Sequence, residues 1–368
     1  MENIRVLVVD DSVVIRRMLS DILSAEPGIE VVATAASGRI ALAKLPFTHP
    51  DVLTLDVEMP QMNGLETLTE LRKTHPELPV VMFSSVDGSS AKQTLEALAH
   101  GGTDVVTKPS GMTNREQAIE HVRQQLVPIV KSLGARALKA RARASAPPRS
   151  VSRPGARVII PETAPSRIDV VAIGASTGGP NALTTLFAKL PQRFPVPILI
   201  VQHMPPLFTK LFAERLDASC DVRVSEAVDG ETPEPGHAYI APGDYHLTVA
   251  RGPSGLKLVL NQGPQENSCR PAADVLFRSV AATFGASSLA VVLTGMGQDG
   301  LVGAKLIREA GGQAVVQDEL SSVVWGMPGY IAKAGLAQAV LPISDLGAEV
   351  TRRVDAFRRR TVQEPNVA

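Results

Sequence analysis

The sequence predicts two α/β domains in one chain of 368 residues: an N-terminal (βα)5 domain and a C-terminal doubly wound domain with a mostly parallel sheet. Two observations support this prediction. Short apolar runs alternate with helical patterns in both halves, as parallel sheets flanked by helices require. Between the halves lies a segment rich in Ala, Arg, Pro and Ser, which is typical of a linker.

In the first half, we expect a strand at each of five apolar runs: IRVLVV, IEVVATA, DVLTLDV, LPVVMFS and TDVVT. The segment SVVIRRMLSDIL keeps Val14, Met18 and Ile22 on one face and predicts a helix, and a last helix is expected near NREQAIEHVRQQL. The pattern favours the flavodoxin-like strand order 2-1-3-4-5. In that order the ligand crevice lies at the carboxyl ends of strands 1 and 3.

Three carboxylates stand at those strand ends. Asp10 and Asp11 follow the first run, and Asp56 ends the third. Mutual repulsion and desolvation make such a cluster costly unless a cation binds it. Mg²⁺ prefers carboxylate and phosphate oxygens, so the sequence predicts a magnesium site at Asp10, Asp11 and Asp56. A helix cap or turn would explain one strand-end aspartate but not this set.

Two further polar residues end the fourth and fifth runs, Ser84 and Lys108. An acyl phosphate on Asp56 would present three acceptor oxygens. Lys108 could give them a charge-assisted hydrogen bond and the Ser84 hydroxyl a neutral one. The sequence therefore predicts a phosphorylation switch with Asp56 as the acceptor.

These residues, together with the loop in DVEMPQMNG, resemble the response-regulator receiver family over residues 3–125. The resemblance implies that a cognate sensor histidine kinase is the phosphodonor. The chain departs from the family at Val105, where receivers often carry an aromatic residue three positions before the strand-5 lysine. Phosphorylation is still expected, whereas Val105 leaves open whether switching uses an aromatic rotamer.

The domain bounds follow from these patterns. We expect a receiver at 1–125, a basic Ala/Pro/Arg linker at 126–166, a second domain at 167–355 and a frayed tail at 356–368. From about Lys131 the like charges should keep the linker extended. A nucleic-acid or acidic-lipid tether is the alternative, but aromatic residues do not interleave with the basic ones.

In the second half, strands are expected at VVAIG, VPILIVQ, HAYIAP, HLTVA, LKLVL, SLAVVLTG and QAVVQ. Helices are expected at PNALTTLFAKL, TKLFAERL, AADVLFRSVAATF and LVGAKLIREA. The Gly- and Pro-punctuated region 230–260 should form an antiparallel excursion from the parallel sheet.

The stretch VVAIGASTGGP runs from a strand through a Gly-rich turn into a helix and exposes Ser176. A dinucleotide loop would favour an acidic residue after the next strand, but that strand ends in His203. A Walker loop would need Gly-Lys-Ser/Thr, which is absent here. A nucleophilic serine with His203 as its base is the interpretation we favour.

Asp299 follows another strand, inside AVVLTGMGQDG, and supplies the carboxylate of a Ser-His-Asp set. Such sets are recognised by geometry rather than chain order. A nucleotide-binding module remains open from these residues alone. His237 and His246 are rival bases, which we expect in the antiparallel excursion rather than on the core sheet.

The second half resembles the catalytic domain of the chemotaxis protein-glutamate methylesterase family, CheB, over roughly residues 168–350. The matching stretches are IGASTGGP, VQHMPPLFTKLFAERL, GHAYIAPGDYH, RPAADVLFRSVA, VVLTGMGQDG and VVWGMP. The resemblance implies Ser176 as nucleophile, His203 as general base and acid, and Asp299 as its orienting residue. It also implies the Met296 amide as oxyanion donor, Thr177 as an auxiliary residue, and no cofactor in the esterase domain.

Together the two resemblances imply a phosphorylation-activated serine hydrolase of chemotaxis adaptation. It would remove methyl esters from glutamate side chains of methyl-accepting chemoreceptors and deamidate receptor glutamines. The alternative is a non-enzymatic receiver-gated signalling adaptor. A DNA-binding regulator is disfavoured, because the second half offers Gly-rich strand ends rather than a basic recognition helix.

Composition agrees with this interpretation. Lys plus Arg and Asp plus Glu each number 37, so no global field favours nucleic acid or an anionic membrane. The two cysteines, Cys220 and Cys269, match no metal or disulfide framework and suit a reducing compartment. The sequence contains no secretory signal pattern and no apolar run of membrane-spanning length. We therefore expect a cytoplasmic protein without direct membrane insertion.

Overall fold

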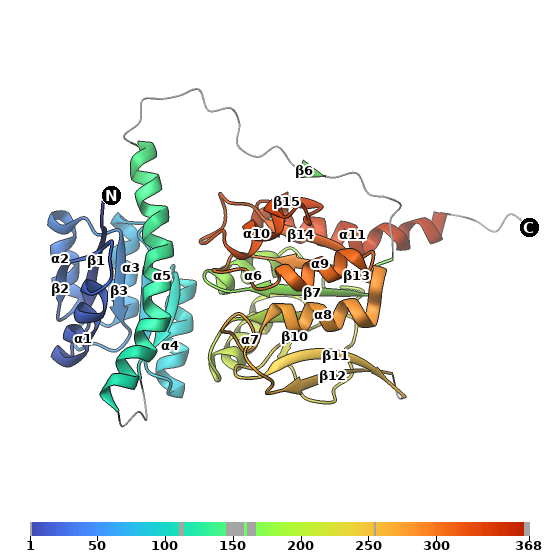
Figure 1. Cartoon of the computed structure of the whole chain (residues 1–368), viewed down its shortest axis with the longest axis horizontal. Coiled ribbons are helices and arrows are strands. Elements are labelled where there is room, and N and C mark those ends of the chain that lie inside the picture. The colour runs from blue at the N-terminus through green and yellow to red at the C-terminus, as the bar shows by residue number, and fades with distance from the viewer. Residues whose placement is uncertain (1, 110–113, 145–157, 160–166, 254, 364–368) are drawn as a thin grey trace, which may run out of the picture. The chain divides into compact units, whose positions relative to one another are not determined.

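The computed structural model describes residues 2–109, 114–144, 158–159, 167–253 and 255–363. The chain divides into two compact units, Met1–Ser152 and Arg153–Ala368 (Figure 1). Among the described residues, no helix combines the length and apolar character needed to cross a membrane.

The first unit contains a five-stranded sheet of order β2-β1-β3-β4-β5, and every pair in it is parallel, as predicted. Its elements are β1 (Ile4–Val9), α1 (Val13–Ser24), β2 (Ile29–Ala35), α2 (Gly38–Thr48), β3 (Val52–Asp56), α3 (Gly64–Thr74), β4 (Val80–Ser84), α4 (Gly88–Ala99), β5 (Asp104–Thr107) and α5 (Arg115–Ala144).

Continuous apolar runs explain the central strands of this sheet. Every residue of β3 and β4 is buried, as expected for parallel strands covered on both faces. Polar side chains cap α1, α2, α3 and α4. The Ser12 hydroxyl accepts from the Ile15 amide at the start of α1, and Asn63 and Glu66 form a capping box at the start of α3.

The last helix of this unit corrects one expectation. We expected a linker from residue 126 that is extended from about Lys131, but α5 runs for 30 residues from Arg115 to Ala144. Val122, Leu126, Val130 and Leu133 form a buried stripe at helical spacing. Ala and Arg are good helix formers, so the composition that suggested a linker also suits a helix. The rest of the expected linker, apart from 158–159, lies outside the described residues up to Arg167.

The second unit contains an eight-stranded sheet of order β6-β15-β14-β13-β7-β8-β10-β9 and a separate antiparallel pair, β11 and β12. Within the eight-stranded sheet only β6 pairs antiparallel. The strands are β6 (Val158–Ile159), β7 (Val170–Ala175), β8 (Ile198–Gln202), β9 (Arg223–Glu226), β10 (His237–Ile240), β11 (His246–Gly252), β12 (Gly255–Asn261), β13 (Ser288–Val292), β14 (Gln313–Gln317) and β15 (Ala339–Leu341).

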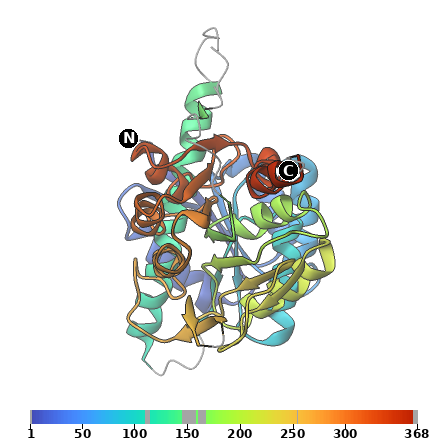
Figure 2. The ribbon, with the colours of Figure 1, turned by 90° about the vertical axis from the view of Figure 1, so that its right-hand side faces the viewer.

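Helices cover both faces of this sheet (Figure 2). On one side α6 contacts α7 and α11, and on the other α8 contacts α9, which contacts α10. The helices are α6 (Gly179–Phe187), α7 (Phe208–Ser219), α8 (Ala273–Phe284), α9 (Leu301–Glu309), α10 (Met327–Lys333) and α11 (Ile343–Gln363), with a 3-10 turn, η1, at Gly285–Ser287. Phe277 and Leu276 of α8 belong to a core that includes Val170 of β7 and Ala290 of β13.

Three expectations for this half are corrected. The antiparallel excursion is limited to β11 and β12, because β10 lies in the main sheet and pairs in parallel with β8 and β9. His237 therefore stands on the core sheet and not in the excursion. Finally, α11 continues through the expected tail to Gln363, and only 364–368 lie outside the described residues. The strands β9 and β15 are too short to stand out as apolar runs.

Candidate functional site

In the first unit, the carboxylates of Asp10, Asp11 and Asp56 lie together. One oxygen of each falls within 4.8 Å of the others, with Asp10 and Asp56 buried and Asp11 exposed. Asp10 follows β1 and Asp56 ends β3, and these strands pair directly in the sheet. The Lys108 Nζ lies 2.7 Å from Asp56 Oδ1 and 3.6 Å from Asp10 Oδ2. Parallel strand ends thus bring four of the predicted residues to one edge.

The electrostatics of this cluster favour a cation. Burial raises the pKa of Asp10 to about 6, and the nearby Asp56 adds to the shift while Lys108 opposes it. Burial also raises the pKa of Asp56, although Lys108 acts against it. Among the described residues, Asp10 Oδ2 and Asp56 Oδ2 are buried without a hydrogen-bond partner. These orphaned oxygens fit a hard divalent cation such as Mg²⁺.

Ser84 ends β4, next to Asp56 on β3, but its hydroxyl is engaged elsewhere. It donates to the Ser85 carbonyl at 3.1 Å and lies 2.6 Å from the Thr94 hydroxyl. To donate to a phosphate on Asp56, the Ser84 hydroxyl would therefore have to give up its hydrogen bond to the Ser85 carbonyl. Val105 is half-buried and pairs with Met82 in the sheet.

In the second unit, Ser176 and His203 leave neighbouring strands at the same level. Ala175 of β7 pairs with Gln202 of β8, and the His203 amide donates to the Ala175 carbonyl at 3.1 Å. After Ser176 the chain turns through Gly178, whose φ of 76° is in the left-handed region, and enters α6. The sequence pattern of strand, Gly-rich turn and helix thus places a serine and a histidine side by side.

Asp299, in the loop between β13 and α9, binds the His203 imidazole. Its Oδ2 lies 2.8 Å from His203 Nε2, and the residue is 1% exposed. The same carboxylate accepts the amides of Ala273 and Asp274, at 2.6 and 3.0 Å, which are the first two of α8. Although burial acts to raise it, the hydrogen bonds from His203 and from these amides lower the pKa of Asp299. Asp299 is thus held as an anion against the ring.

Comparison with known proteins assigns both units. Residues 6–120 match the response regulator receiver domain family, and residues 171–350 match the CheB methylesterase family. The protein-glutamate methylesterase/protein-glutamine glutaminase of Trichodesmium erythraeum is 49% identical over 354 residues, which cover 96% of this chain and 100% of that protein. The chain belongs to this methylesterase/glutaminase family. The protein of the same name from Nocardioides sp. is also 49% identical, over 96% of each chain.

One solved structure extends the comparison. The CheB methylesterase catalytic domain of Thermotoga maritima matches with a TM-score of 0.50 and 40% identity. The match covers 51% of this chain and 99% of that domain. The doubly wound fold of the second unit is therefore the fold of a CheB catalytic domain.

The methylesterase unit does not join Ser176 to His203 directly. Ser176 is half-buried, and its hydroxyl makes no hydrogen bond to any described residue. The imidazole instead uses both nitrogens elsewhere, Nε2 for Asp299 and Nδ1 for Cys269, whose Sγ lies 3.5 Å away. Burial disfavours a charge on His203, but the contacts with Cys269 and Asp299 outweigh it and raise the pKa of the imidazole.

Two residues that sequence reasoning missed hold the Ser176 loop in place, Thr294 in the loop after β13 and Gln202 at the end of β8. Thr294, 1% exposed, accepts the Ser176 amide at its carbonyl and donates its hydroxyl to the Thr177 carbonyl at 2.9 Å. The Gln202 amide donates to the carbonyls of Ser176 and His203, at 3.0 and 3.3 Å. Only their positions at strand ends could have pointed to Thr294 and Gln202 in the sequence, because threonine and glutamine are not residue types that indicate a functional site.

Met296, expected to supply an oxyanion donor, lies half-buried between two glycines. Gly295 approaches Ser176 so closely that a Cβ at this position would lie 2.8 Å from the Ser176 Cβ. Gly297 has a φ of 78°. The turn carrying Met296 therefore lies against the Ser176 loop because its first residue has no side chain.

The rival histidines have structural partners. His237 lies 2.8 Å from the Ser225 hydroxyl and stacks on Tyr239 with ring centroids 4.1 Å apart. Burial lowers the pKa of its imidazole. His246 Nε2 lies 2.9 Å from the Pro264 carbonyl oxygen. Neither histidine contacts the Ser176 loop, so both are excluded as the base in this arrangement.

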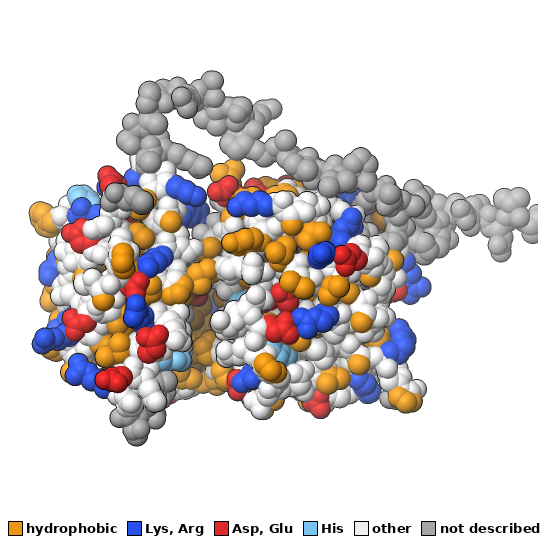
Figure 3. Space-filling view, in the orientation of Figure 1, with side chains coloured by type: hydrophobic (Ala, Val, Ile, Leu, Met, Phe, Trp, Pro, Cys, Tyr) orange, Lys and Arg blue, Asp and Glu red, His pale blue; other side chains and the backbone are white. Residues whose placement is uncertain are grey.

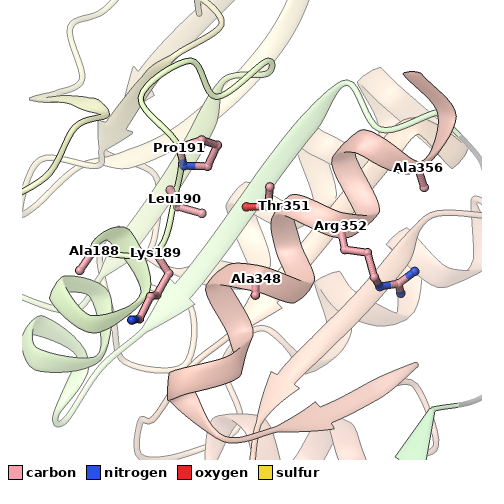
Figure 4. A pocket seen from close by; sticks show the side chains of 8 residues that line it. All are labelled: Ala188, Lys189, Leu190, Pro191, Ala348, Thr351, Arg352 and Ala356. Atoms are coloured by element: carbon pink, nitrogen blue, oxygen red, sulfur yellow. The ribbon is translucent and has the colours of Figure 1, made fainter. Parts of the chain in front are cut away.

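A separate groove of about 520 Å³ opens between the end of α6 and α11 (Figure 4). It is lined by Ala188, Lys189, Leu190, Pro191, Ala348, Thr351, Arg352 and Ala356 and contains no member of the Ser-His-Asp set. On the face of the molecule drawn in Figure 3, basic and acidic side chains are interspersed in both units. That face offers no single-sign surface for a polyanion.

Proposed function

We propose that this chain is a phosphorylation-activated serine hydrolase of chemotaxis adaptation. It removes methyl esters from glutamate side chains of chemoreceptors and deamidates receptor glutamines. Residues 1–125 act as the receiver and 167–355 as the catalytic domain. The observation that carries the proposal is the juxtaposition of Ser176 and His203 on paired strand ends, with His203 bonded to a buried Asp299 carboxylate. The names of the related proteins support the substrate class.

The arrangement supports acyl transfer through one proton route. Because Nε2–H of His203 donates to Asp299, Nδ1 is the nitrogen that takes the Ser176 proton. The Ser176 oxygen attacks the γ-carbonyl, and the Met296 amide stabilises the resulting oxyanion, a contribution of about 3–4 kcal/mol for one such donor. Methanol, or ammonia from an amide, leaves with the proton from His203. Water then hydrolyses the acyl-enzyme by the same route.

Thr177 is the auxiliary residue of this proposal. It is 3% exposed, directly follows the nucleophile, and its carbonyl is fixed by Thr294. Its backbone therefore moves little relative to Ser176. We assign it the role of keeping the nucleophile loop in register rather than a proton-transfer role.

The receiver is proposed to take a phosphoryl group onto Asp56 from a cognate sensor histidine kinase. Asp10, Asp11 and Asp56 would hold Mg²⁺, which neutralises the carboxylates during attack. Lys108 already binds Asp56 Oδ1 and would bind a phosphate oxygen there. The Ser84 hydroxyl would turn away from the Ser85 carbonyl to donate to the same phosphate.

The test is methanol release from membranes that contain methylated chemoreceptors. The intact protein should release methanol, faster with acetyl phosphate and Mg²⁺. Ser176→Ala should abolish release, whereas Ser344→Ala, at an exposed serine of α11, should not change it. Asp56→Asn should keep the basal rate and lose the stimulation. No release under any condition, with Asp56 still phosphorylated, would replace this proposal by the signalling adaptor.

A further inference from the structure

Cys269 lies against the nitrogen that the proposed mechanism needs. Its Sγ is 3.5 Å from His203 Nδ1, while Nε2 is occupied by Asp299. The Asp299 carboxylate is itself saturated, since it accepts the amides of Ala273, Asp274 and Gly300 and the Asn267 side chain as well as the ring. The carboxylate that binds Nε2 is therefore itself held in place. A single nitrogen, Nδ1, is left for both the Cys269 thiol and the Ser176 hydroxyl.

A tight turn holds the thiol in this place. Asn267 and Ser268 have φ values of 52° and 62°, and Glu266 and Cys269 exchange backbone hydrogen bonds of 3.2 and 2.9 Å across them. This is the geometry of a two-residue hairpin turn with both central residues left-handed, in which asparagine is favoured. Glu266 also forms an ion pair of 2.6 Å with Arg278 of α8.

The side chain of Asn267 ties the same turn to two buried carboxylates. Its amide nitrogen lies 3.0 Å from Asp299 Oδ1 and 3.0 Å from Asp274 Oδ2. One short turn thus contacts His203 through Cys269 and its acidic partner through Asn267. The hydrogen bonds of Asn267 and of the turn backbone therefore hold Cys269 in contact with the imidazole.

We propose that Cys269 is a positioning residue, which binds Nδ1 of His203 in the unliganded site and keeps this nitrogen from Ser176 until substrate displaces the thiol. The inference rests on the proposed esterase function. It explains why the Ser176 hydroxyl makes no hydrogen bond to the described residues although its strand neighbours His203. When Ser176 binds Nδ1, the sulfur loses its partner and the half-buried thiol turns away.

The protonation of the ring provides the readout. The titratable groups that face His203 are Asp299, from the loop after β13, and Cys269, from the turn before α8, with Asp274 of α8 joined to Asp299 through Asn267. In the proposed unliganded site the imidazole is protonated, so Nε2–H donates to the Asp299 carboxylate and Nδ1–H to the Cys269 sulfur, and the sulfur thereby favours the charged ring. Removing the sulfur should therefore favour the neutral, basic ring at lower pH. A side chain that only fills space would not produce this change.

The test uses the full chain with histidines labelled at Cε1, and His203→Gln to assign the resonance among the seven histidines. In Cys269→Ala the His203 titration should move down by about one pH unit. In Cys269→Ser, which keeps a hydrogen-bonding group, it should move less. Cys220→Ala is the matched control, because the Cys220 sulfur contacts the Val222 carbonyl instead, and should leave the titration unchanged.

The second measurement is kcat/KM for receptor methyl-ester hydrolysis against pH. The acid limb of the kcat/KM profile should shift to lower pH together with the NMR titration of His203. At a pH below the midpoint of the parent protein, Cys269→Ala should therefore be several-fold faster than the parent. An unchanged or raised titration, or a rate that is lower at every pH, would overturn the inference. A shifted titration without any hydrolysis would instead overturn the proposed function and leave the contact of Cys269 with His203 standing.

Discussion

Asp299 and Asp274 cap each other's helices. Asp299 lies just before α9 and accepts the first amides of α8, whereas Asp274 lies in α8 and accepts the Gly303 amide of α9 at 2.7 Å. Neither helix has a cap from its own N-cap residue. The amide of Asn267 joins the two carboxylates. The carboxylate that binds His203 is therefore also part of the framework that packs α8 against α9.

This double role predicts two separable losses in Asp299→Asn. The amide group would place a donor against backbone donors, so the free energy of unfolding should fall by about 1–3 kcal/mol. The orientation and charge of His203 would also be lost, which should lower kcat on the order of 10⁴-fold. Denaturant unfolding and initial rates measure the two effects.

Asp274→Ala is the matched control for that variant. It removes the cap of α9 but leaves every hydrogen bond of Asp299 to the imidazole and α8. Its stability should fall by a similar amount, while kcat should stay within about tenfold of the parent. Equal losses of kcat in both variants would contradict the assignment of Asp299 as the direct partner of His203.

The contact of Thr294 with the backbone of Ser176 and Thr177 predicts that stability and kcat are also sensitive to substitution of Thr294. Thr294→Val keeps the shape but removes the hydroxyl that donates to the Thr177 carbonyl and accepts the Val324 amide. The Thr177 carbonyl and the Val324 amide would each lose their hydrogen bond to this hydroxyl, which should cost about 1–3 kcal/mol of unfolding free energy. The less restrained Ser176 loop should lower kcat on the order of tenfold or more.

Thr184→Val is the control for this change, because Thr184 is exposed on α6 and its hydroxyl only contacts the Pro180 carbonyl of the same helix. It should alter stability by less than about 0.5 kcal/mol and leave kcat unchanged. If Thr294→Val behaves like Thr184→Val in denaturant unfolding and in rate, the loop does not depend on the Thr294 hydroxyl.

The parts of the sites that the sequence could predict are those that lie on strand ends. Asp10, Asp56 and Lys108 converge because parallel strands end at one edge, and Ser176 and His203 do so for the same reason. Cys269 and Asn267 could not be predicted, since they reach the site from a turn whose left-handed backbone leaves only a weak sequence signal. The length of α5 was missed because composition does not distinguish an Ala/Arg-rich helix from a linker.

The acidic cluster predicts that Mg²⁺ binding depends on pH. Burial raises the pKa of Asp10 to about 6, so protons compete with the ion below that value. Affinity should fall about tenfold per pH unit below pH 6 and level off above it. For the stability of the ion-free receiver, the effect of acid through Asp10 has the opposite sign. The folded Asp10 binds its proton more tightly than the unfolded one, so acidification from pH 6 towards 4 stabilises the receiver through this group.

Titration calorimetry of the full chain with Mg²⁺ at pH 5, 6 and 7.5 measures this effect. Asp10→Asn should remove most of the binding, whereas Asp21→Asn, at an exposed acid of α1, should not change it. An affinity that is the same at pH 5 and 7.5 would show that the Asp10 carboxylate is not among the ligands.

Gly179, the first residue of α6, provides the last prediction. A Cβ at this position would lie 1.9 Å from Gln202 Oε1 and 3.0 Å from the Ala175 Cβ. Gln202 is 2% exposed, and its amide donates to the carbonyls of Ser176 and His203, so a shift of this side chain would disturb both hydrogen bonds. Gly179→Ala should therefore cost about 1–3 kcal/mol in unfolding free energy and lower kcat as the two loops separate.

A double-mutant cycle tests the stated cause. Gln202→Ala makes room for the new Cβ, so the double variant should be less destabilised than the sum of the single variants by about 1 kcal/mol or more. Gly88→Ala, where a Cβ meets nothing within 4 Å, should change neither stability nor rate appreciably. Additive effects of Gly179→Ala and Gln202→Ala would mean that the clash lies elsewhere, and that Gln202 does not connect the helix start to the two catalytic loops.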